Sequence, residues 1–149
     1  MLFRSLLVQA GDTHFVLPLN VVEECVELTS AEIARFHGRR VLPVRDQLMP
    51  YVRLRDFFEM DGERPEREQM VVVQMDGGRA GLVLDEVIGG HQTVIKSLGW
   101  IYRQAEGLSG STILGSGEVA LIIDVPQLIQ RAHQEEAMHV RNRTRATVH

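Results

Sequence analysis

The chain has 149 residues, of which 44% are hydrophobic and 24% are charged, and its formal net charge is −4. These values are ordinary for a globular domain that can bury a sizeable core. The acidic balance gives no overall basic footprint for nucleic acid, and no apolar run reaches the length that spans a bilayer.

A β-hairpin is the first element that the pattern predicts. Apolar stretches over 6–9 and 15–19 flank Gly11 and Asp12, a pair typical of the tight turn between antiparallel strands. Residues 1–7 resemble the start of a signal peptide only superficially, because no small-residue cleavage site follows them and the strand pattern begins at once.

The segment after this hairpin contains the single cysteine of the chain. Asn20, with Glu23 three residues later, can start a short helical turn. Cys25 stands among apolar neighbours, so we expect a small buried hydrophobe and not a reactive thiol. One cysteine excludes an internal disulfide and suits a reducing compartment, which indicates a cytoplasmic protein.

Short elements and connections follow up to residue 68. Residues 29–33 are interpreted as a polar connection, and Asp56 with the two phenylalanines after it as a short turn. The charged stretch 59–68 is most simply a solvated linker between two halves of the chain, with an electrostatic docking loop as the alternative.

A second hairpin, over 70–84, repeats the first around an Asp-Gly-Gly turn. The two hairpins match at an offset of 65, so that Leu82 corresponds to Leu17 (82 − 17). A second turn-and-strand unit is repeated at an offset of 71, so that Ile123 corresponds to Val52 (123 − 52). A repeat of this length favours two related sub-barrels over a solenoid of short units.

The clearest helix begins at Asp124. Asp124 can cap it, Pro126 is tolerated in its first turn, and Gln127 can complete a capping box. Leu128 and Ile129 belong to an apolar face at helical spacing, which we expect to dock on the body of the protein.

No catalytic constellation is found in the sequence. The six histidines show no spacing typical of a zinc site, and no metal or other cofactor is expected. Ser109 does not lie in a nucleophile elbow, because the required Gly-x-Ser-x-Gly is absent. The Gly-x-Gly at Gly115 and Gly117 precedes a strand and not a helix, which favours a hairpin turn over a phosphate-binding loop.

Two surface features remain as candidates for function. Trp100, Ile101 and Tyr102 form an aromatic cluster that is either a core plug between lobes or a partner contact. The extra residues of the second half fall in this region, over 100–111, where we expect the halves to differ most in partner choice. Arg45 is interpreted either as a solvated turn arginine or as a recognition residue at a groove between lobes.

Four stretches resemble a known family. Residues 15–24 are similar to the opening of a CheW-like domain, 44–54 to its central Arg-Gly segment, and 81–89 to its second lobe. The stretch 107–125, with its Gly-x-Gly turn, is the most specific and resembles the C-terminal regulatory domain of the chemotaxis histidine kinase CheA. Asp46 departs from the usual glycine, but aspartate tolerates the left-handed conformation of such a turn.

The resemblance covers nearly all of residues 4–130 and implies a mainly β fold. It implies two pseudo-repeated, intertwined five-stranded SH3-like barrels with a short C-terminal helix, in agreement with the repeat. The expected domain spans 1–138, with lobe one at about 15–65, lobe two at about 66–125 with strand exchange, and a polar tail over 139–149.

The resemblance also implies a role without catalysis. The domain is expected to bind a CheW-type adaptor and the cytoplasmic tip of chemoreceptors, to be joined to the rest of the kinase, and to couple receptor state to kinase activity. Neither nucleic-acid binding nor direct membrane insertion is expected. Unequal lobes favour heterologous contacts, which close into rings or extend as lattices. The residues expected to contact partners are Arg45 at the receptor groove, Leu48, Met49 and Tyr51 in lobe one, and Ile113, Val119 and Ile122 in lobe two.

Two alternatives stay open at this point. A free-standing CheW-type adaptor has the same fold, and the native reading frame upstream of Met1 would separate it from a kinase domain. An independent enzyme with a small β-barrel active site would need a cleft lined by convergent titratable groups.

Overall fold

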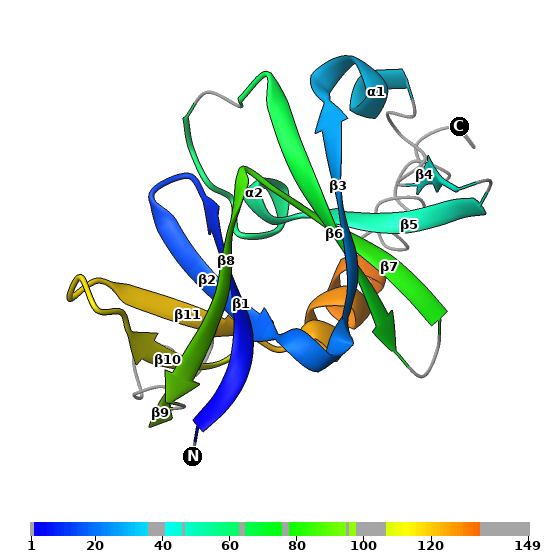
Figure 1. The fold of residues 1–149 in the computed structure, drawn as a ribbon. Coiled ribbons are helices and arrows are strands. Elements are labelled where there is room, and N and C mark those ends of the chain that lie inside the picture. Colours follow the sequence, from blue (N-terminus) through cyan, green and yellow to red (C-terminus); the bar gives the residue numbers. More distant parts are fainter. Residues whose placement is uncertain are drawn as a thin grey trace, which may run out of the picture.

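Two β-sheets lie side by side in the computed structural model (Figure 1). The structure describes residues 2–35, 41–45, 47–62, 65–75, 78–94, 96–97 and 107–134. The first sheet, in the order β8-β1-β2-β11-β10-β9, consists of β1 (Leu2–Ala10), β2 (Thr13–Pro18), β8 (Glu86–Val94), β9 (Lys96–Ser97), β10 (Leu108–Ile113) and β11 (Val119–Ile123). The second, in the order β3-β6-β7-β5-β4, consists of β3 (Val22–Thr29), β4 (Val41–Val44), β5 (Gln47–Arg53), β6 (Arg67–Met75) and β7 (Gly78–Leu84). The fold is mainly β, as expected, and the two-residue β9 adds a sixth strand where five were expected.

Helices are few and short in the described residues. They are η1 (Leu19–Val21), α1 (Ser30–Arg35), α2 (Leu54–Phe57) and a helix over 125–134. The structure thus contains the short turn expected at Asp56 and the helix expected after Asp124.

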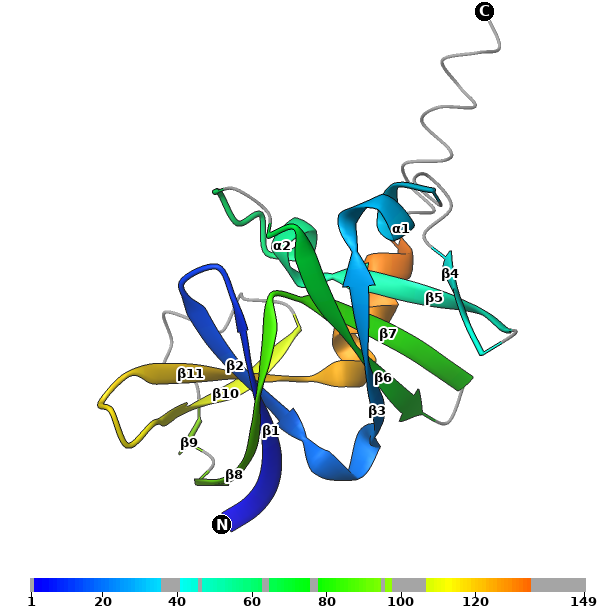
Figure 2. The ribbon, with the colours of Figure 1, turned by 45° about the horizontal axis from the view of Figure 1, so that its top comes forward.

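The two halves of the chain exchange hairpins. The hairpin β1–β2 lies in the same sheet as β8–β11, and the hairpin β6–β7 lies in the same sheet as β3–β5. The chain passes between the sheets through η1, after β2, and through Asp85, after β7 (Figure 1 and Figure 2). Each sheet is therefore built from both halves, and the two halves are intertwined.

Both hairpins have two-residue connections. In the first, Ala10 lies opposite Thr13, and Gly11 between them has a φ of 57°, the left-handed value that favours glycine. In the second, Met75 lies opposite Gly78. The two residues that connect them, 76 and 77, lie outside the described residues.

The internal repeat of the sequence is also found in the strand registers. Each hairpin is extended by one parallel pair, in which Tyr51 of β5 lies opposite Gly81 of β7 and Ile122 of β11 lies opposite Val16 of β2. Ile122 follows Tyr51 by 71 residues (122 − 51), and Gly81 follows Val16 by 65 (81 − 16). These are the two offsets found in the sequence. The two copies therefore share a strand arrangement as well as a sequence pattern.

A β-bulge is repeated at the edges of the two sheets. The bulge in β3 leaves Glu23 without an opposite residue in β6, and the bulge in β8 leaves Ile88 without one in β1. These residues are again 65 apart (88 − 23). Glu23 forms an ion pair with Arg79 (2.9 Å), whereas the apolar side chain of Ile88 is 47% exposed. The same edge feature is therefore polar in one copy and apolar in the other.

Three apolar clusters form the core of the described residues. The largest packs between the two sheets and contains Phe15, Leu82 and Leu128. Two smaller ones lie on the other face of each sheet. The cluster of the second sheet consists of Leu28, Ile33, Leu42, Val44, Met49, Tyr51, Met70, Val72 and Val83, and the cluster of the first sheet consists of Leu7, Val16, Leu114, Ala120 and Ile122. Strands such as β6 and β7 are thus covered on both faces, which explains their imperfect apolar–polar alternation.

The cap of the 125–134 helix is partly as predicted. Asp124 Oδ1 accepts a hydrogen bond from the backbone N–H of Gln127 (3.2 Å), and the apolar face with Leu128 and Ile129 is buried. The expected capping box is wrong, because Gln127 Oε1 accepts instead from the backbone N–H of Gly107 (2.7 Å). Gly107 also accepts a bond from the Asp124 N–H (2.8 Å), so Gln127 ties the helix to the start of β10.

Two predictions about local helices are wrong. Residues 29–33 are not a polar connection, because Thr29 Oγ1 accepts from the N–H of Glu32 (3.2 Å) and caps α1, while Ile33 is buried. The helical turn after β2 does not start at Asn20, because η1 begins at Leu19 without a side-chain cap and ends before the bulge of β3.

Two arginine–carboxylate pairs lie in the second sheet and at its junction with the first. Arg53 at the end of β5 pairs with the fully buried Glu68 of β6. Arg55 of α2 donates from Nε (2.8 Å) and Nη2 (2.5 Å) to Asp85, which also accepts from the N–H of Gly11 (2.9 Å). Asp85 therefore joins α2, the β1–β2 turn and one of the two passages between the sheets.

Candidate protein-interaction surfaces

Arg45 occupies the turn between β4 and β5. Its backbone is left-handed, with a φ of 48°, and its side chain is 81% exposed. Its Nη2 lies 3.3 Å from Oε2 of Glu24 on β3. Because β3 and β4 are the two edges of the second sheet, this ion pair links the turn after one edge strand to the other edge strand. Asp46, the residue that departs from the family glycine, lies outside the described residues.

The contact residues predicted in lobe one, Leu48, Met49 and Tyr51, lie on different faces of β5. Leu48 is 65% exposed and lies opposite Pro43 of β4, which is also exposed. Met49 and Tyr51 are buried in the cluster of the second sheet. In the described structure only Leu48 of these three exposes its side chain to solvent.

The contact residues predicted in lobe two, Ile113, Val119 and Ile122, also differ in exposure. Ile113 (56% exposed) lies directly opposite Val119 (55% exposed) in the β10–β11 hairpin. Ile122 is buried in the cluster of the first sheet. The hairpin therefore presents one apolar cross-strand pair to solvent.

The exposed apolar pairs of the two hairpins occupy corresponding places in the strand registers, although Ile113 follows Pro43 by 70 residues (113 − 43) and not by 71. Val119 follows Leu48 by the second offset of 71 (119 − 48), and each lies opposite an exposed apolar residue, Ile113 or Pro43. We call these the β4–β5 pair (Pro43, Leu48) and the β10–β11 pair (Ile113, Val119).

Opposite charges flank the two pairs. The exposed guanidinium of Arg45 is in the turn beside the β4–β5 pair. The carboxylate of Glu118, next to Val119, is 59% exposed and lies 3.0 Å from Nδ1 of His14. A contact between a β4–β5 pair and a β10–β11 pair would bury apolar surface and bring unlike charges together.

Ile88 is an exposed residue that sequence reasoning missed. It belongs to the edge strand β8 and lies at the bulge, on the exposed face of that strand. The available signal was the 65-residue offset, which aligns Ile88 with the charged Glu23 and thus with a solvent-facing position. Trp100, Ile101 and Tyr102, the predicted aromatic cluster, lie outside the described residues.

The prediction that Cys25 is buried is wrong. Cys25 is exposed on the edge strand β3, where it alternates with the inward-facing side chains of its neighbours. Partial shielding of the thiol, and then the negative charge of Glu24, raise the pKa of Cys25. Exposure alone therefore does not make this thiol nucleophilic.

Cys25 is expected to react with a soluble disulfide reagent more slowly than N-acetylcysteine does at pH 7.5. A raised pKa means less thiolate at neutral pH, and the rate should rise toward that of the free thiol as the pH increases. Stopped-flow measurements from pH 7 to pH 10 give the titration midpoint. The Glu24→Gln variant should lower that midpoint, and a wild-type midpoint below that of the free thiol would contradict the account.

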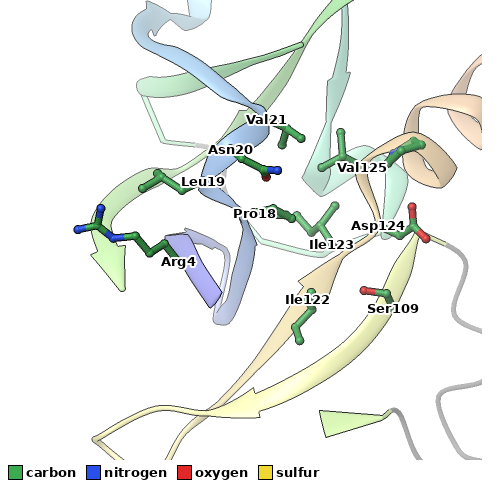
Figure 3. Close-up of a pocket in the computed structure, with 11 residues that line it drawn as sticks. Arg4, Pro18, Leu19, Asn20, Val21, Ser109, Ile122, Ile123, Asp124 and Val125 are labelled. Atoms are coloured by element: carbon green, nitrogen blue, oxygen red, sulfur yellow. The ribbon is translucent and has the colours of Figure 1, made fainter. Parts of the chain in front are cut away.

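A cavity of about 740 Å³ opens between η1 and the start of the 125–134 helix. Figure 3 shows Pro18 and Ile123 at its centre, Val21 and Val125 above them, and Asn20 and Ser109 on opposite sides. Its full lining consists of Arg4, Pro18, Leu19, Asn20, Val21, Ser109, Ile122, Ile123, Asp124, Val125 and Pro126. The walls are largely apolar, with a few polar groups at the margin.

No group of three histidine, cysteine or acidic side chains in the described part of the chain could hold a metal ion. A second, polar depression of about 540 Å³ contains Arg55, which is already paired with Asp85, and the acids Asp12, Glu59 and Asp61. Among the described helices, none is long and apolar enough to cross a membrane.

Comparison with known proteins identifies the family. A model of the CheW-like domain matches residues 4–133. The chain is 41% identical over 134 residues to the chemotaxis protein CheA of Salmonella typhimurium and 35% identical over 126 residues to that of Bacillus subtilis. These matches cover 88% and 83% of the chain but only 20% and 19% of the relatives, so the chain spans about a fifth of their length.

A solved structure supports the fold. The crystal structure of the scaffolding protein TtCheW from Thermoanaerobacter tengcongensis has a TM-score of 0.69 to this chain at 17% identity, covering 83% of this chain and 90% of that one. With the exchanged hairpins and the family match over residues 4–133, the conclusion is that this chain belongs to the CheW-like domain family.

Proposed function

We propose that the chain is a non-catalytic docking domain of a chemotaxis signalling complex, and specifically the regulatory domain of a CheA-type histidine kinase. The similarity to curated CheA proteins at up to 41% identity supports the kinase context. The role is to bind a CheW-type adaptor and the cytoplasmic tip of a chemoreceptor, and so to couple receptor state to the kinase in the cytoplasm. The observation that carries the proposal is the pair of exposed apolar hairpins at corresponding places in the strand registers.

The two pairs support a heterologous mode of assembly. The β4–β5 pair of one protein would meet the β10–β11 pair of a CheW-like neighbour, with Arg45 facing an acidic group such as Glu118. Because each domain offers both surfaces, such contacts can be repeated from protein to protein and close into rings or extend as lattices. Met49, Tyr51 and Ile122 would then support the surface from the core without contacting the partner.

Arg45 is proposed as a receptor-contacting residue. Its side chain is mostly exposed although it forms an ion pair with Glu24, so three or more of its donors can meet a partner. The Arg45→Ala variant should weaken binding of a receptor-tip fragment and the adaptor contact of the β4–β5 pair, and leave adaptor binding through the β10–β11 pair intact.

Leu48→Glu and Val119→Glu are each expected to weaken the one adaptor contact in which the residue lies by at least tenfold, because each places an unpaired charge in an apolar contact. Isothermal titration calorimetry with a CheW-type adaptor measures the loss. Gln47→Glu and Ser116→Glu are matched controls, since they add the same charge to the same hairpins beside the apolar pairs.

The size of the complexes shows whether the β4–β5 pair and the β10–β11 pair each bind a separate adaptor molecule. In light scattering, wild-type chain mixed with adaptor should form species larger than one-to-one, and either single variant should stop at one-to-one complexes. Absence of binding to both the adaptor and the receptor-tip fragment would refute the proposed function.

A free-standing CheW-type adaptor is the second candidate, and the fold shared with TtCheW favours it. The two candidates differ in covalent context, since only the first is joined to a kinase core. Sequencing the native gene on both sides of the region that encodes this chain distinguishes them.

A further inference from the structure

We propose that His14 regulates the adaptor contact of the β10–β11 pair, because its protonated imidazole competes with a cation of the adaptor for the carboxylate of Glu118. The contact is then weaker at pH 6 than at pH 8. The inference deepens the proposed function and rests on it for the identity of the partner, a CheW-type adaptor that brings a positive charge to Glu118.

The Glu118 carboxylate lies between a shielded histidine and solvent. His14 is near the start of β2, opposite Gln9 of β1 and Ala120 of β11, and only 18% of its side chain is exposed. Its Nδ1 lies 3.0 Å from Oε2 of Glu118, whose own side chain is 59% exposed. Glu118 directly precedes Val119 of the exposed pair. An imidazole can therefore reach this carboxylate from within the sheet, and a partner's charge can reach it from outside.

The backbone of the β10–β11 turn is fixed independently of this ion pair. The N–H of Leu114 donates to the carbonyl of Glu118 (2.8 Å), and the N–H of Gly117 donates to the carbonyl of Leu114 (2.9 Å). A change of partner by the Glu118 carboxylate therefore requires only a rotation of its side chain, and the apolar pair beside it keeps its place in the hairpin.

The other charged groups near His14 are acids and an arginine. Asp12 lies two residues before it in the β1–β2 turn, and Glu86 of β8 lies opposite Gln9, one strand further away. Three more charged groups line the polar depression to which Thr13, but not His14, contributes: Arg55, Glu59 and Asp61. Carboxylates and arginines have ordinary pKa values outside the interval from pH 5 to pH 8, whereas that of histidine lies inside it. Among these groups an imidazole is thus the one suited to change the charge of the contact near neutral pH.

Protonation acts on the adaptor contact in one direction. A positive imidazole pairs with Glu118 more strongly than a neutral one does, and it repels the cation that the adaptor brings to the same carboxylate. Both effects weaken the contact as the pH falls. Because exposed ion pairs contribute modestly to binding, the expected change in the dissociation constant between pH 8 and pH 6 is about threefold. By linkage, adaptor binding should also favour release of the proton.

The internal repeat shows that this device belongs to one half only. Arg79 stands in the other half where His14 stands in the first (79 − 14 = 65), and Gln47 corresponds to Glu118 (118 − 47 = 71). Arg79 pairs instead with Glu23 (2.9 Å), and Gln47 carries no charge. The β4–β5 contact of this chain therefore lacks both the imidazole and the carboxylate.

The first test isolates the contact in the full chain by means of the Leu48→Glu variant, in which the β10–β11 pair remains. In calorimetric titrations with the adaptor, its dissociation constant should be about threefold larger at pH 6 than at pH 8. Addition of His14→Gln should remove this difference and give the tighter value at both pH values. Addition of His14→Arg, which introduces the arginine of the other half, should give the weaker value at both. Circular dichroism verifies that each variant is folded.

The Val119→Glu variant provides the matched control, since it leaves the β4–β5 contact. In that background, His14→Gln should change the affinity at neither pH. Equal affinity of Leu48→Glu at the two pH values would overturn the proposal. So would a pH difference that persists after His14→Gln, because the titrating group would then lie elsewhere.

The second test needs no partner. In NMR spectra of the free wild-type chain, the backbone amides of Glu118 and Val119 should shift with pH at the same midpoint as the ring signals of His14. The shifts should vanish in His14→Gln, and their absence in the wild type would overturn the proposal even if the adaptor binds. If the wild-type chain binds no adaptor at either pH, the proposed function fails, and this titration still decides whether His14 controls Glu118.

Discussion

Replacing Glu68 with glutamine is expected to lower the free energy of unfolding by about 3–5 kcal/mol. Glu68 is fully buried, and its carboxylate accepts hydrogen bonds from Nε (3.2 Å) and Nη2 of Arg53. Burial lowers the pKa of Arg53, but the hydrogen bond and charge of Glu68 outweigh this and raise it, so the guanidinium stays charged. Removing the carboxylate charge therefore leaves a buried cation without compensation.

Urea unfolding followed by circular dichroism measures this loss, and an exposed ion pair on the other side of β6 provides a control. Arg67 of β6 pairs with Glu27 of β3 at 3.3 Å, but both side chains are more than half exposed. Glu27→Gln should therefore cost about 1 kcal/mol or less. A loss in Glu68→Gln no larger than in this control would contradict the importance of burial.

The double variant Arg53→Met with Glu68→Leu should recover most of the stability lost in Glu68→Gln. A buried ion pair gains its Coulomb energy at a high desolvation cost, so apolar residues of similar volume can replace both partners at little net cost. The difference between the single and double variants thus separates the penalty of an unpaired charge from the net contribution of the pair.

The sequence was sufficient to predict the architecture because the repeat is long and its offsets are fixed. The offsets of 65 and 71 reappear in the parallel strand pairs and in the two bulges. The cap at Asp124 was predictable for a different reason, since it depends on residues three positions apart. The hydrogen bond of Gln127 could not be predicted, because its partner Gly107 is twenty residues away.

The sequence could only partly distinguish exposed from buried side chains among the predicted contact residues. Leu48 and Met49 are adjacent in β5, and period-two alternation places them on opposite faces without saying which face is covered. Tyr51 continues the buried face of Met49, but the next residues are buried as well because α2 and the other sheet cover them. Choosing Leu48 alone would have required knowledge of how the sheets pack.

Cys25 was misjudged for a related reason. Its apolar neighbours suggested burial, but β3 is an edge strand with one exposed face, and Cys25 lies on that face. Alternation along a strand defines two faces, and the position of the strand in the sheet decides which of them is covered.

Asp85→Asn is expected to destabilise the protein by about 2–4 kcal/mol at pH 7, because it leaves the buried guanidinium of Arg55 without its counter-charge. The same carboxylate accepts a hydrogen bond from the N–H of Gly11, and the Asp85 N–H donates to the carbonyl of Gln9 (3.0 Å). The variant should therefore also increase amide hydrogen exchange at Gly11, where the two sheets meet. Urea unfolding gives the first quantity and exchange followed by NMR the second.

The pH dependence of this loss distinguishes the charge from the shape of Asp85. Burial raises the pKa of the Asp85 carboxyl, but hydrogen bonds from Arg55 and Gly11 outweigh it and lower the pKa below its ordinary value. Stability from a lowered pKa is fully present above the unfolded value, about 3.9, and is lost as the pH falls through the folded value. The difference between wild type and Asp85→Asn should therefore be constant from pH 5 to pH 8 and shrink below about pH 4. Asp61→Asn, an exposed acid in the neighbouring depression, should show no such change. A wild-type advantage that persists undiminished at the lowest pH would mean that Asp85 acts through packing and not through its charge.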